Sequence, residues 1–320
     1  MTEQLTAWRS TGLHWESGSP VLTAVPDGRL RPGHAGPGQA EHKRVLTLGQ
    51  RIDWTLRGPR RCCGIWTGTG RIACPLNSSL EDGTDPQCGA CAAADPGKAL
   101  ARDAVTDDGR TFGLYLAWFG PGLLKIGLTA ADRGRDRLLE QGAITYAMLA
   151  AGSYSGIRRT ERLISGTGLA RERIPARAKT TAWWSLPDAA SRAAEVTAAR
   201  VRISGQVTWP GGARETPGPV IDQAAGFGLD RALPAGWDEV TAITSGARLA
   251  GELIAVVGRQ ILLTTTGTPL LLDMRRIAGW GLAASPPAGS ASAGSLSADG
   301  LTVISRTRPK EASDDQHTLF

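Results

Sequence analysis

The middle of the chain shows the clearest change in hydrophobic period. Residues 112–119 and 123–128 are two mostly apolar runs separated by a tight turn, a pattern that predicts a β-hairpin. After this hairpin the apolar positions recur at helical spacing. That spacing predicts helices over residues 131–141, 155–165 and 187–200.

Both flanks of this region alternate apolar and polar residues in short runs between Gly- and Pro-rich turns, which is typical of short strands. Residues 284–298 are rich in Ser, Gly and Pro and indicate a linker. We therefore expect an α+β protein with β-rich N- and C-terminal modules around a small central sheet with flanking helices. The expected segments are an N-terminal β module (1–61), a cysteine-rich segment (62–95), a central domain (111–200), a C-terminal β module (201–285) and a disordered tail (286–320).

Composition is that of an ordinary globular chain, with 320 residues, 41% hydrophobic and 21% charged. No apolar run approaches the roughly 18 residues that a membrane helix needs. The N-terminal stretch MTEQLTAWRSTG lacks the basic and apolar regions of a secretory signal. We expect a cytoplasmic protein with no membrane partner.

Positive charge is concentrated in one part of the chain. Residues 123–180 hold eleven Lys and Arg against five acidic residues, a net charge of +6. A local excess of this kind suits an anionic partner such as a phosphate backbone, although a solvated Arg-rich surface would give the same count. The candidate contacts to nucleic acid are Arg133, Arg135, Arg158 and Lys179. All four histidines lie outside this segment, which disfavours a histidine base.

All five cysteines fall between positions 62 and 91, as Cys62-Cys63, Cys74 and the Cys88-x-x-Cys91 pair. This clustering predicts a structural Zn(II) site with four thiolate ligands. The alternative is a set of free buried thiols in which the CxxC pair is redox-active. Adjacent residues of an extended chain point to opposite sides, so Cys62 or Cys63 can be a ligand but not easily both.

The motifs CGIW, ACP, QCGAC, KIGLT and EQGA occur in order over residues 50–285. This part of the chain resembles a bacterial and archaeal domain-of-unknown-function family that joins a cysteine zinc knuckle (CxGW…CP…QCxxC) to a LYLA…KIG…EQGA block. With the neighbouring Gly64, that resemblance favours Cys63 as the first ligand. The expected zinc ligands are Cys63, Cys74, Cys88 and Cys91.

Residues 111–185 also resemble the GIY-YIG nuclease domain of the KIG type. The resemblance implies a three-stranded sheet with flanking helices, in which Tyr115 helps to activate water. Lys125 replaces the second strand tyrosine, and Arg137 binds the scissile phosphate. Glu161 is implied as the ligand of Mg(II) or Mn(II).

Two functions stay open on these residues. The first is a zinc-stabilised nucleic-acid-binding protein, for DNA rather than RNA, that is also a divalent-metal-dependent endonuclease in DNA maintenance. The alternative is a non-catalytic nucleic-acid-binding or interaction protein that kept the fold and lost cleavage. The nucleases carry an asparagine late in the domain, and this chain has no match to it, because Asn77 is its only asparagine. This departure counts against cleavage.

The last five residues carry a further pattern. Gln316, Leu319 and Phe320 resemble the short peptide by which many bacterial DNA-processing proteins dock on the sliding clamp. This resemblance implies the clamp as a partner. The other interpretation is an arbitrary chain end, since five-residue matches arise readily by chance.

Overall fold

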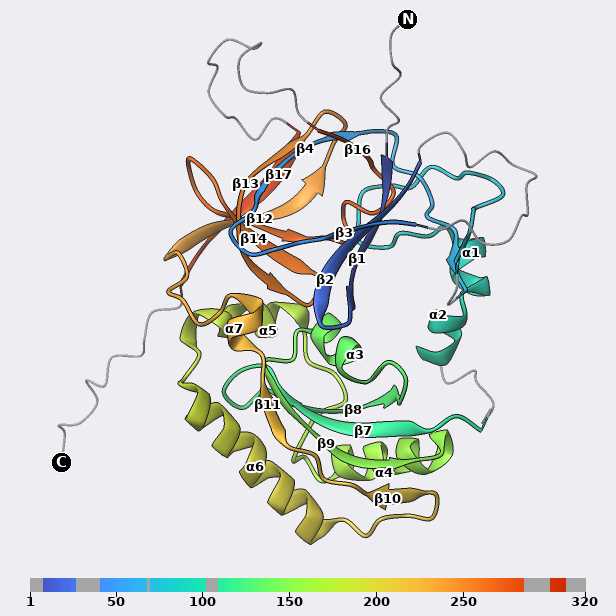
Figure 1. Ribbon diagram of the computed structural model, residues 1–320, viewed down its shortest axis with the longest axis vertical. Coiled ribbons are helices and arrows are strands. Elements are labelled where there is room, and N and C mark those ends of the chain that lie inside the picture. Colours follow the sequence, from blue (N-terminus) through green and yellow to red (C-terminus); the bar gives the residue numbers. More distant parts are fainter. Residues whose placement is uncertain (1–7, 27–40, 68–69, 102–108, 285–299, 309–320) are drawn as a thin grey trace, which may run out of the picture.

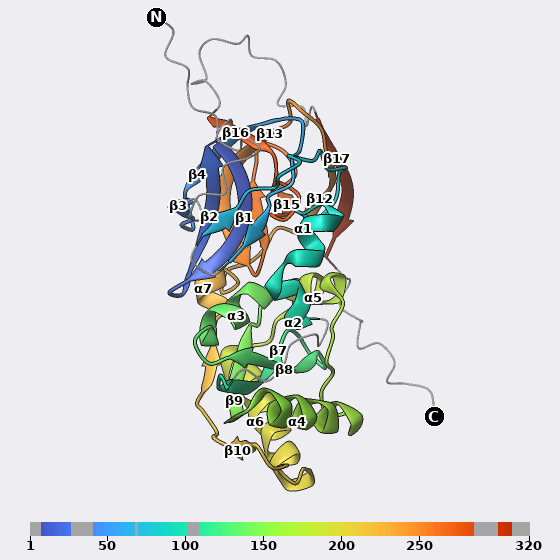
Figure 2. The same ribbon diagram turned by 90° about the vertical axis from the view of Figure 1, so that its right-hand side faces the viewer.

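The computed structural model describes residues 8–26, 41–67, 70–101, 109–284 and 300–308, and Figures 1 and 2 show it in two views. A large sheet lies above a smaller central sheet in both views. The expected clamp motif at Gln316, Leu319 and Phe320 lies outside the described residues. No helix among those residues is long and apolar enough to cross a membrane.

The large sheet has ten strands, and all its pairs are antiparallel except one parallel pair, β12 with β15. Across the sheet the strands are β17 (Leu301–Thr307), β12 (Gly236–Ile243), β15 (Leu270–Asp273), β14 (Gln260–Thr264), β13 (Arg248–Val257), β4 (Arg51–Arg57), β16 (Gly281–Ala284), β1 (Trp8–Glu16), β2 (Ser19–Pro26) and β3 (His42–Val45).

Both ends of the chain therefore contribute to one sheet, and the two β-rich modules expected from the sequence are not separate in the structure. Strand β4 lies between β13 and β16, so an N-terminal strand pairs with C-terminal strands on both sides. The expectation of a disordered tail from residue 286 is wrong for residues 301–307. These residues form β17, which pairs with β12 and places Val303 opposite Val240.

The central sheet has the order β10-β9-β7-β8, with β11 also paired to β9. Its strands are β7 (Phe112–Trp118), β8 (Leu124–Ala130), β9 (Thr145–Gly152), β10 (Ala213–Glu215) and β11 (Val220–Asp222). The expected hairpin of β7 and β8 is confirmed. The central unit extends past the expected boundary at residue 200, because β10 and β11 both pair with β9.

Three helices lie at the expected places, and α5 and α7 are additions to them. In chain order the helices are α3 (Gly134–Gln141), α4 (Tyr154–Gly166), α5 (Ala176–Ala182) and α6 (Ala189–Gln206), followed by α7 (Ala224–Phe227). The side chains of Ser153 and Asp188 accept hydrogen bonds from the first turns of α4 and α6 and so cap these helices. Helix α5 and strand β9 were not predicted from the sequence.

Every residue of β7 is buried. Leu114, Leu116 and Trp118 belong to the main core together with Ile157 of α4 and Val196 of α6. The alternate residues face a second cluster: Tyr115, Ala117 and Phe119 pack with Leu138 of α3 and Ile174. Because successive side chains of a strand point to opposite faces, β7 is covered on both sides.

The cysteine-rich segment forms a small unit attached to the large sheet. It contains β5 (Ile65–Trp66), β6 (Arg71–Ile72), α1 (Gly89–Ala94) and α2 (Pro96–Ala101). The buried Arg60 holds it in place, since its guanidinium donates to the carbonyl oxygens of Ala278, Glu81 and Asp85 at 2.7–2.9 Å. Three such bonds satisfy a charged group that burial would otherwise destabilise.

The two sheets are joined by packing and by hydrogen bonds. Trp184, in the 3₁₀ turn Trp183–Ser185, stacks on Trp237 of β12 with ring centroids 3.6 Å apart. At the other end of the joint, the Asp136 carboxylate of α3 accepts from the backbone N–H groups of Ser17 and Gly18 in the β1–β2 turn. A continuous core of buried residues runs through both sheets.

The position of β17 gives a prediction about stability. Val303 packs against the core, whereas its neighbour Thr302 is exposed. Val303→Asp would place a charge against apolar side chains, and we expect it to lower the free energy of unfolding by about 2 kcal/mol. Thr302→Asp adds the same charge on the solvent face and should be nearly neutral. Urea unfolding curves that are the same for both variants would contradict the assignment of β17 to the sheet.

Candidate metal centre and basic surface

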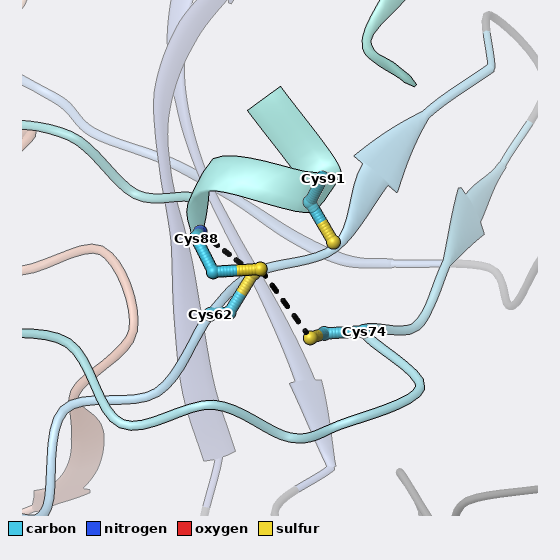
Figure 3. Close-up of side chains that lie close together, drawn as sticks. All are labelled: Cys62, Cys74, Cys88 and Cys91. Carbon is cyan, nitrogen blue, oxygen red and sulfur yellow. Dashed lines mark hydrogen bonds between the residues drawn. The ribbon is translucent and has the colours of Figure 1, made fainter. Parts of the chain in front are cut away.

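Four cysteines from three parts of the cysteine-rich segment point toward one another (Figure 3). The sulfur atoms of Cys62, Cys74, Cys88 and Cys91 all lie within 4.8 Å of one another. The Cys74 and Cys88 sulfurs are 3.9 Å apart. Four sulfurs held tetrahedrally by Zn–S bonds would be separated by about 3.8 Å, so this tetrad could hold a metal such as zinc.

The prediction of Cys63 as the first ligand is wrong, and Cys62 takes its place. The Cys63 thiol turns the other way and lies 3.7 Å from the carbonyl oxygen of Ser10 in β1. Burial raises the pKa of Cys63 to about 12, which keeps it a neutral thiol. The two neighbouring side chains diverge as the extended backbone requires, with Cys62 toward the tetrad and Cys63 toward β1.

Local backbone structure explains how the tetrad forms. Cys88 precedes the first turn of α1, so Cys91 on that turn comes back toward it. Gly64 has a positive φ of 70°, and a Cβ there would lie 2.0 Å from the carbonyl oxygen of Ile72. Only glycine therefore allows the chain after Cys62 to approach the strand that leads to Cys74.

Backbone donors surround the Cys62 sulfur, which accepts from the N–H groups of Cys88 at 3.2 Å and Gly64 at 3.4 Å. Such donors favour a thiolate and orient it toward a metal. Hydrogen bonding to the Cys91 backbone lowers the pKa of Cys88 to about 6, whereas burial raises the pKa of Cys62 and Cys91. The tetrad is a closed set of four sulfur ligands, which is typical of structural zinc.

The residues implied by the nuclease resemblance lie around Lys125. Tyr115 is 1% exposed, and its hydroxyl oxygen accepts from Lys125 Nζ at 3.1 Å and from Gln141 Nε2 at 2.6 Å. Gly127 lies opposite Tyr115 on β8, and a Cβ there would be 2.3 Å from the tyrosine hydroxyl. The glycine of the KIG motif thus makes room for the tyrosine side chain.

Glu161 is also close to this group but is not open to solvent. It is 4% exposed, and its carboxylate accepts from Arg158, which also pairs with Glu172 at 3.5 Å. Burial raises the pKa of Glu161, against the opposing effects of Arg158 and Lys125. Within the described residues Glu161 belongs to no group of three or more potential metal ligands, and the Cys tetrad is the group of that kind.

The remaining predicted residues make contacts inside the protein. Arg133 and Arg137 both pair with the buried Glu140, at 2.7 and 3.4 Å. Arg135 donates to the side-chain oxygen of Gln223 at 3.1 Å. Lys179 donates to the carbonyl oxygen of Gln141 at 3.1 Å and lies over the Phe119 ring. These contacts fix α3 and α5 against their neighbours.

Comparison with protein families gives one match, to the family described as Protein of unknown function (DUF2797), over residues 87–282. This range is more than half of the chain. The chain belongs to the DUF2797 family. The expected membership in a domain-of-unknown-function family is confirmed, and the likeness to GIY-YIG nucleases stays a prediction. No curated protein and no solved structure gave a significant match.

The DUF2797 region begins at Gln87, next to Cys88, and ends in β16. It contains the central sheet and most of the C-terminal strands of the large sheet. Cys62 and Cys74 lie before it, so half of the tetrad comes from outside the matched region. The cysteine tetrad therefore joins the N-terminal part of the chain to the start of the DUF2797 region.

Sequence reasoning missed the arginines that the structure leaves exposed. In the part of the chain that the structure describes, Arg159, Arg171, Arg173 and Arg177 are exposed and form no ion pair with a carboxylate. Their acidic neighbours are already engaged, since Glu161 and Glu172 both pair with Arg158. The count of eleven basic residues in residues 123–180 includes these arginines, but it does not show which of the eleven side chains are exposed and unpaired.

The adjacent Cys62 and Cys63 provide a matched pair of variants for the metal centre. Cys62→Ser removes a ligand, and we expect it to lose the metal and a large part of its stability. Cys63→Ser changes a buried thiol outside the tetrad and should keep about one zinc per chain. Elemental analysis of freshly purified protein, with thermal unfolding alongside, measures both effects. Zinc retained by the Cys62 variant and lost by the Cys63 variant would contradict the assignment.

Proposed function

We propose that this DUF2797 protein is a zinc-stabilised nucleic-acid-binding protein, with DNA as the expected partner. The observation that carries the proposal is the exposed, unpaired set Arg159, Arg171, Arg173 and Arg177. Guanidinium groups contact phosphate oxygens in a bidentate manner, and a phosphate backbone offers a row of them. Several such contacts from arginines that form no ion pair with a carboxylate give a favourable, salt-dependent affinity.

Backbone hydrogen bonds hold Arg171 in a fixed place. Arg171 pairs with β8: its N–H donates to the carbonyl oxygen of Leu124, and its carbonyl oxygen accepts from the N–H of Ile126, both at 3.0 Å. This bridge places the chain around Arg171 and Arg173 along the edge of the central sheet, next to Lys125. Charges carried on ordered backbone lose less conformational freedom on binding than charges on a flexible tail.

The zinc centre has a structural part in this proposal. The cysteine-rich segment has two very short strands and two six-residue helices. Its own core consists mainly of cysteines, with Ile65 and Leu80 packed against them. So little apolar surface stabilises a fold weakly, and a bound metal would supply the missing free energy.

Phosphodiester cleavage is the second candidate, favoured by the position of Tyr115, Lys125 and Glu161 in one neighbourhood. The same geometry argues for binding without cleavage. The Tyr115 hydroxyl is covered and already accepts two hydrogen bonds, and the Glu161 carboxylate is buried against Arg158. A water-activating group and a metal ligand both need access to the substrate.

Duplex DNA binding should depend on the exposed arginines. We expect the double variant Arg171→Gln, Arg173→Gln to weaken binding roughly tenfold at low salt, because two phosphate contacts are removed. Arg202→Gln with Arg214→Gln is the matched control, since both arginines are exposed on α6 and β10 and the loss of net charge is equal. Fluorescence anisotropy with a labelled duplex measures both. Equal weakening in the two double variants would show that only net charge matters, and would contradict the proposed surface.

Cleavage is tested on the same DNA. We expect duplex, branched and single-stranded DNA to stay intact in Mg(II) or Mn(II), while binding persists in a chelator that leaves the zinc content unchanged. Metal-dependent strand breaks that disappear in Glu161→Gln would instead establish the endonuclease and refute binding without cleavage. Gel electrophoresis under denaturing conditions separates the two outcomes.

A further inference from the structure

A cavity of about 230 Å³ lies where the central sheet meets the large sheet. Arg137 of α3 and Lys179 of α5 line it from one side. Arg259, in the turn between β13 and β14, and Arg275, just after β15, line it from the other. The acidic residues in the lining are Glu140 and Asp273.

The basic residues of this cavity are not balanced by its acidic residues. The Asp273 carboxylate is paired with Arg275, whose Nε and Nη2 both donate hydrogen bonds to it. The Glu140 carboxylate is shared by three guanidinium groups, those of Arg133 at 2.7 Å, Arg137 at 3.4 Å and Arg259 at 3.7 Å. The lining has four basic residues, one of which is Lys179, against two acidic ones, so its formal charge is positive when all four are protonated.

Desolvation makes this surplus charge costly. Arg259 keeps 42% of its side chain accessible, as expected for a group that faces a cavity, yet burial by the surrounding protein lowers its pKa. Burial, together with the charges of Lys125 and Arg137, lowers the pKa of Lys179 to about 7. Like charges held together in a partly dehydrated cavity are stabilised when an anion binds between them.

We propose that this cavity binds a phosphate monoester group, as a dianion held between Arg137, Lys179 and Arg259. Guanidinium forks match the tetrahedral arrangement of phosphate oxygens, and a charge of about −1.5 to −2 matches the surplus in the lining. The group comes either from the end of a nucleic acid strand or from a small phosphorylated compound. The first source rests on the proposed function, and the phosphate site itself does not.

The site needs both parts of the protein. Arg137 and Lys179 belong to helices packed on the central sheet, and Arg259 belongs to the large sheet. A phosphate bound between them would therefore stabilise the joint between the sheets. The cavity is a different site from the exposed arginines of the proposed DNA surface, because Arg171 and Arg173 do not line it.

Binding is tested on the full-length zinc-loaded protein with inorganic phosphate, against sodium chloride of equal ionic strength. We expect saturable heat of binding and a rise in the unfolding temperature with phosphate. Arg259→Gln and Lys179→Met should each weaken phosphate binding at least tenfold, because each removes a direct contact. Arg214→Gln, an exposed arginine at the opposite edge of the central sheet from β8, should leave it unchanged.

A second comparison identifies the source of the phosphate. An oligonucleotide with a 5′-phosphate that binds more tightly than its 5′-hydroxyl form, with the gain lost in Arg259→Gln, supports a strand end. Phosphate binding without that gain supports a small phosphorylated compound in the same site. Zinc content and circular dichroism show whether the variants are folded. If Arg259→Gln does not fold, Lys179→Met is used in its place.

Two outcomes would overturn the proposal: no saturable phosphate binding by the wild-type protein, or equal phosphate affinity of Arg259→Gln and Arg214→Gln. Its failure can be told from failure of the proposed function. The double variant Arg171→Gln, Arg173→Gln should keep its phosphate affinity while its duplex affinity is weakened. If the protein binds duplex DNA but no phosphate, the phosphate site in the cavity is refuted and the proposed DNA binding is not.

Discussion

Strand β7 carries apolar side chains on both of its faces, and both faces are buried. One face of the strand packs against α4 and α6, and the other packs against α3 and the chain around Ile174. Apolar side chains on both faces are stable only if both are covered. The chain that leads to Ile174 bridges to β8 at Arg171, and α3 is held against the β1–β2 turn of the large sheet by Asp136.

Burial also decides which charges remain available. Glu140 and Glu161 are buried; Glu140 is paired with three arginines and Glu161 with Arg158. An unpaired buried carboxylate would be costly, so these residues take up some of the basic side chains. Arg171 and Arg173 form no such pair and face the solvent, whereas Arg259 shares Glu140 with two other arginines and lines the cavity between the sheets. One distribution of charge thus accounts for both proposals.

Sequence patterns predicted a substantial part of this arrangement. The β7–β8 hairpin and helices α3, α4 and α6 follow from local hydrophobic period, and the CxxC pair indicated a cysteine metal centre. The choice of Cys62 over Cys63 depends on which side of the strand faces the tetrad, and a local pattern does not contain that information. Strand β17 follows a linker-like stretch, and its partner β12 is about sixty residues away in the chain. Pairings between distant parts of the chain determine the strand order of the large sheet and the carboxylate partners of individual arginines, so a local sequence pattern does not predict them.

If exposed arginines bind a phosphate backbone, the affinity for duplex DNA must fall as salt is added. Each phosphate contact contributes a slope of about −0.9 to a plot of log affinity against log salt concentration. We expect a steep negative slope for the wild-type protein that becomes shallower by about two contacts when Arg171 and Arg173 are both replaced by glutamine. An affinity that does not change with salt, or a slope that the two substitutions leave unchanged, would show that these arginines do not bind the phosphate backbone.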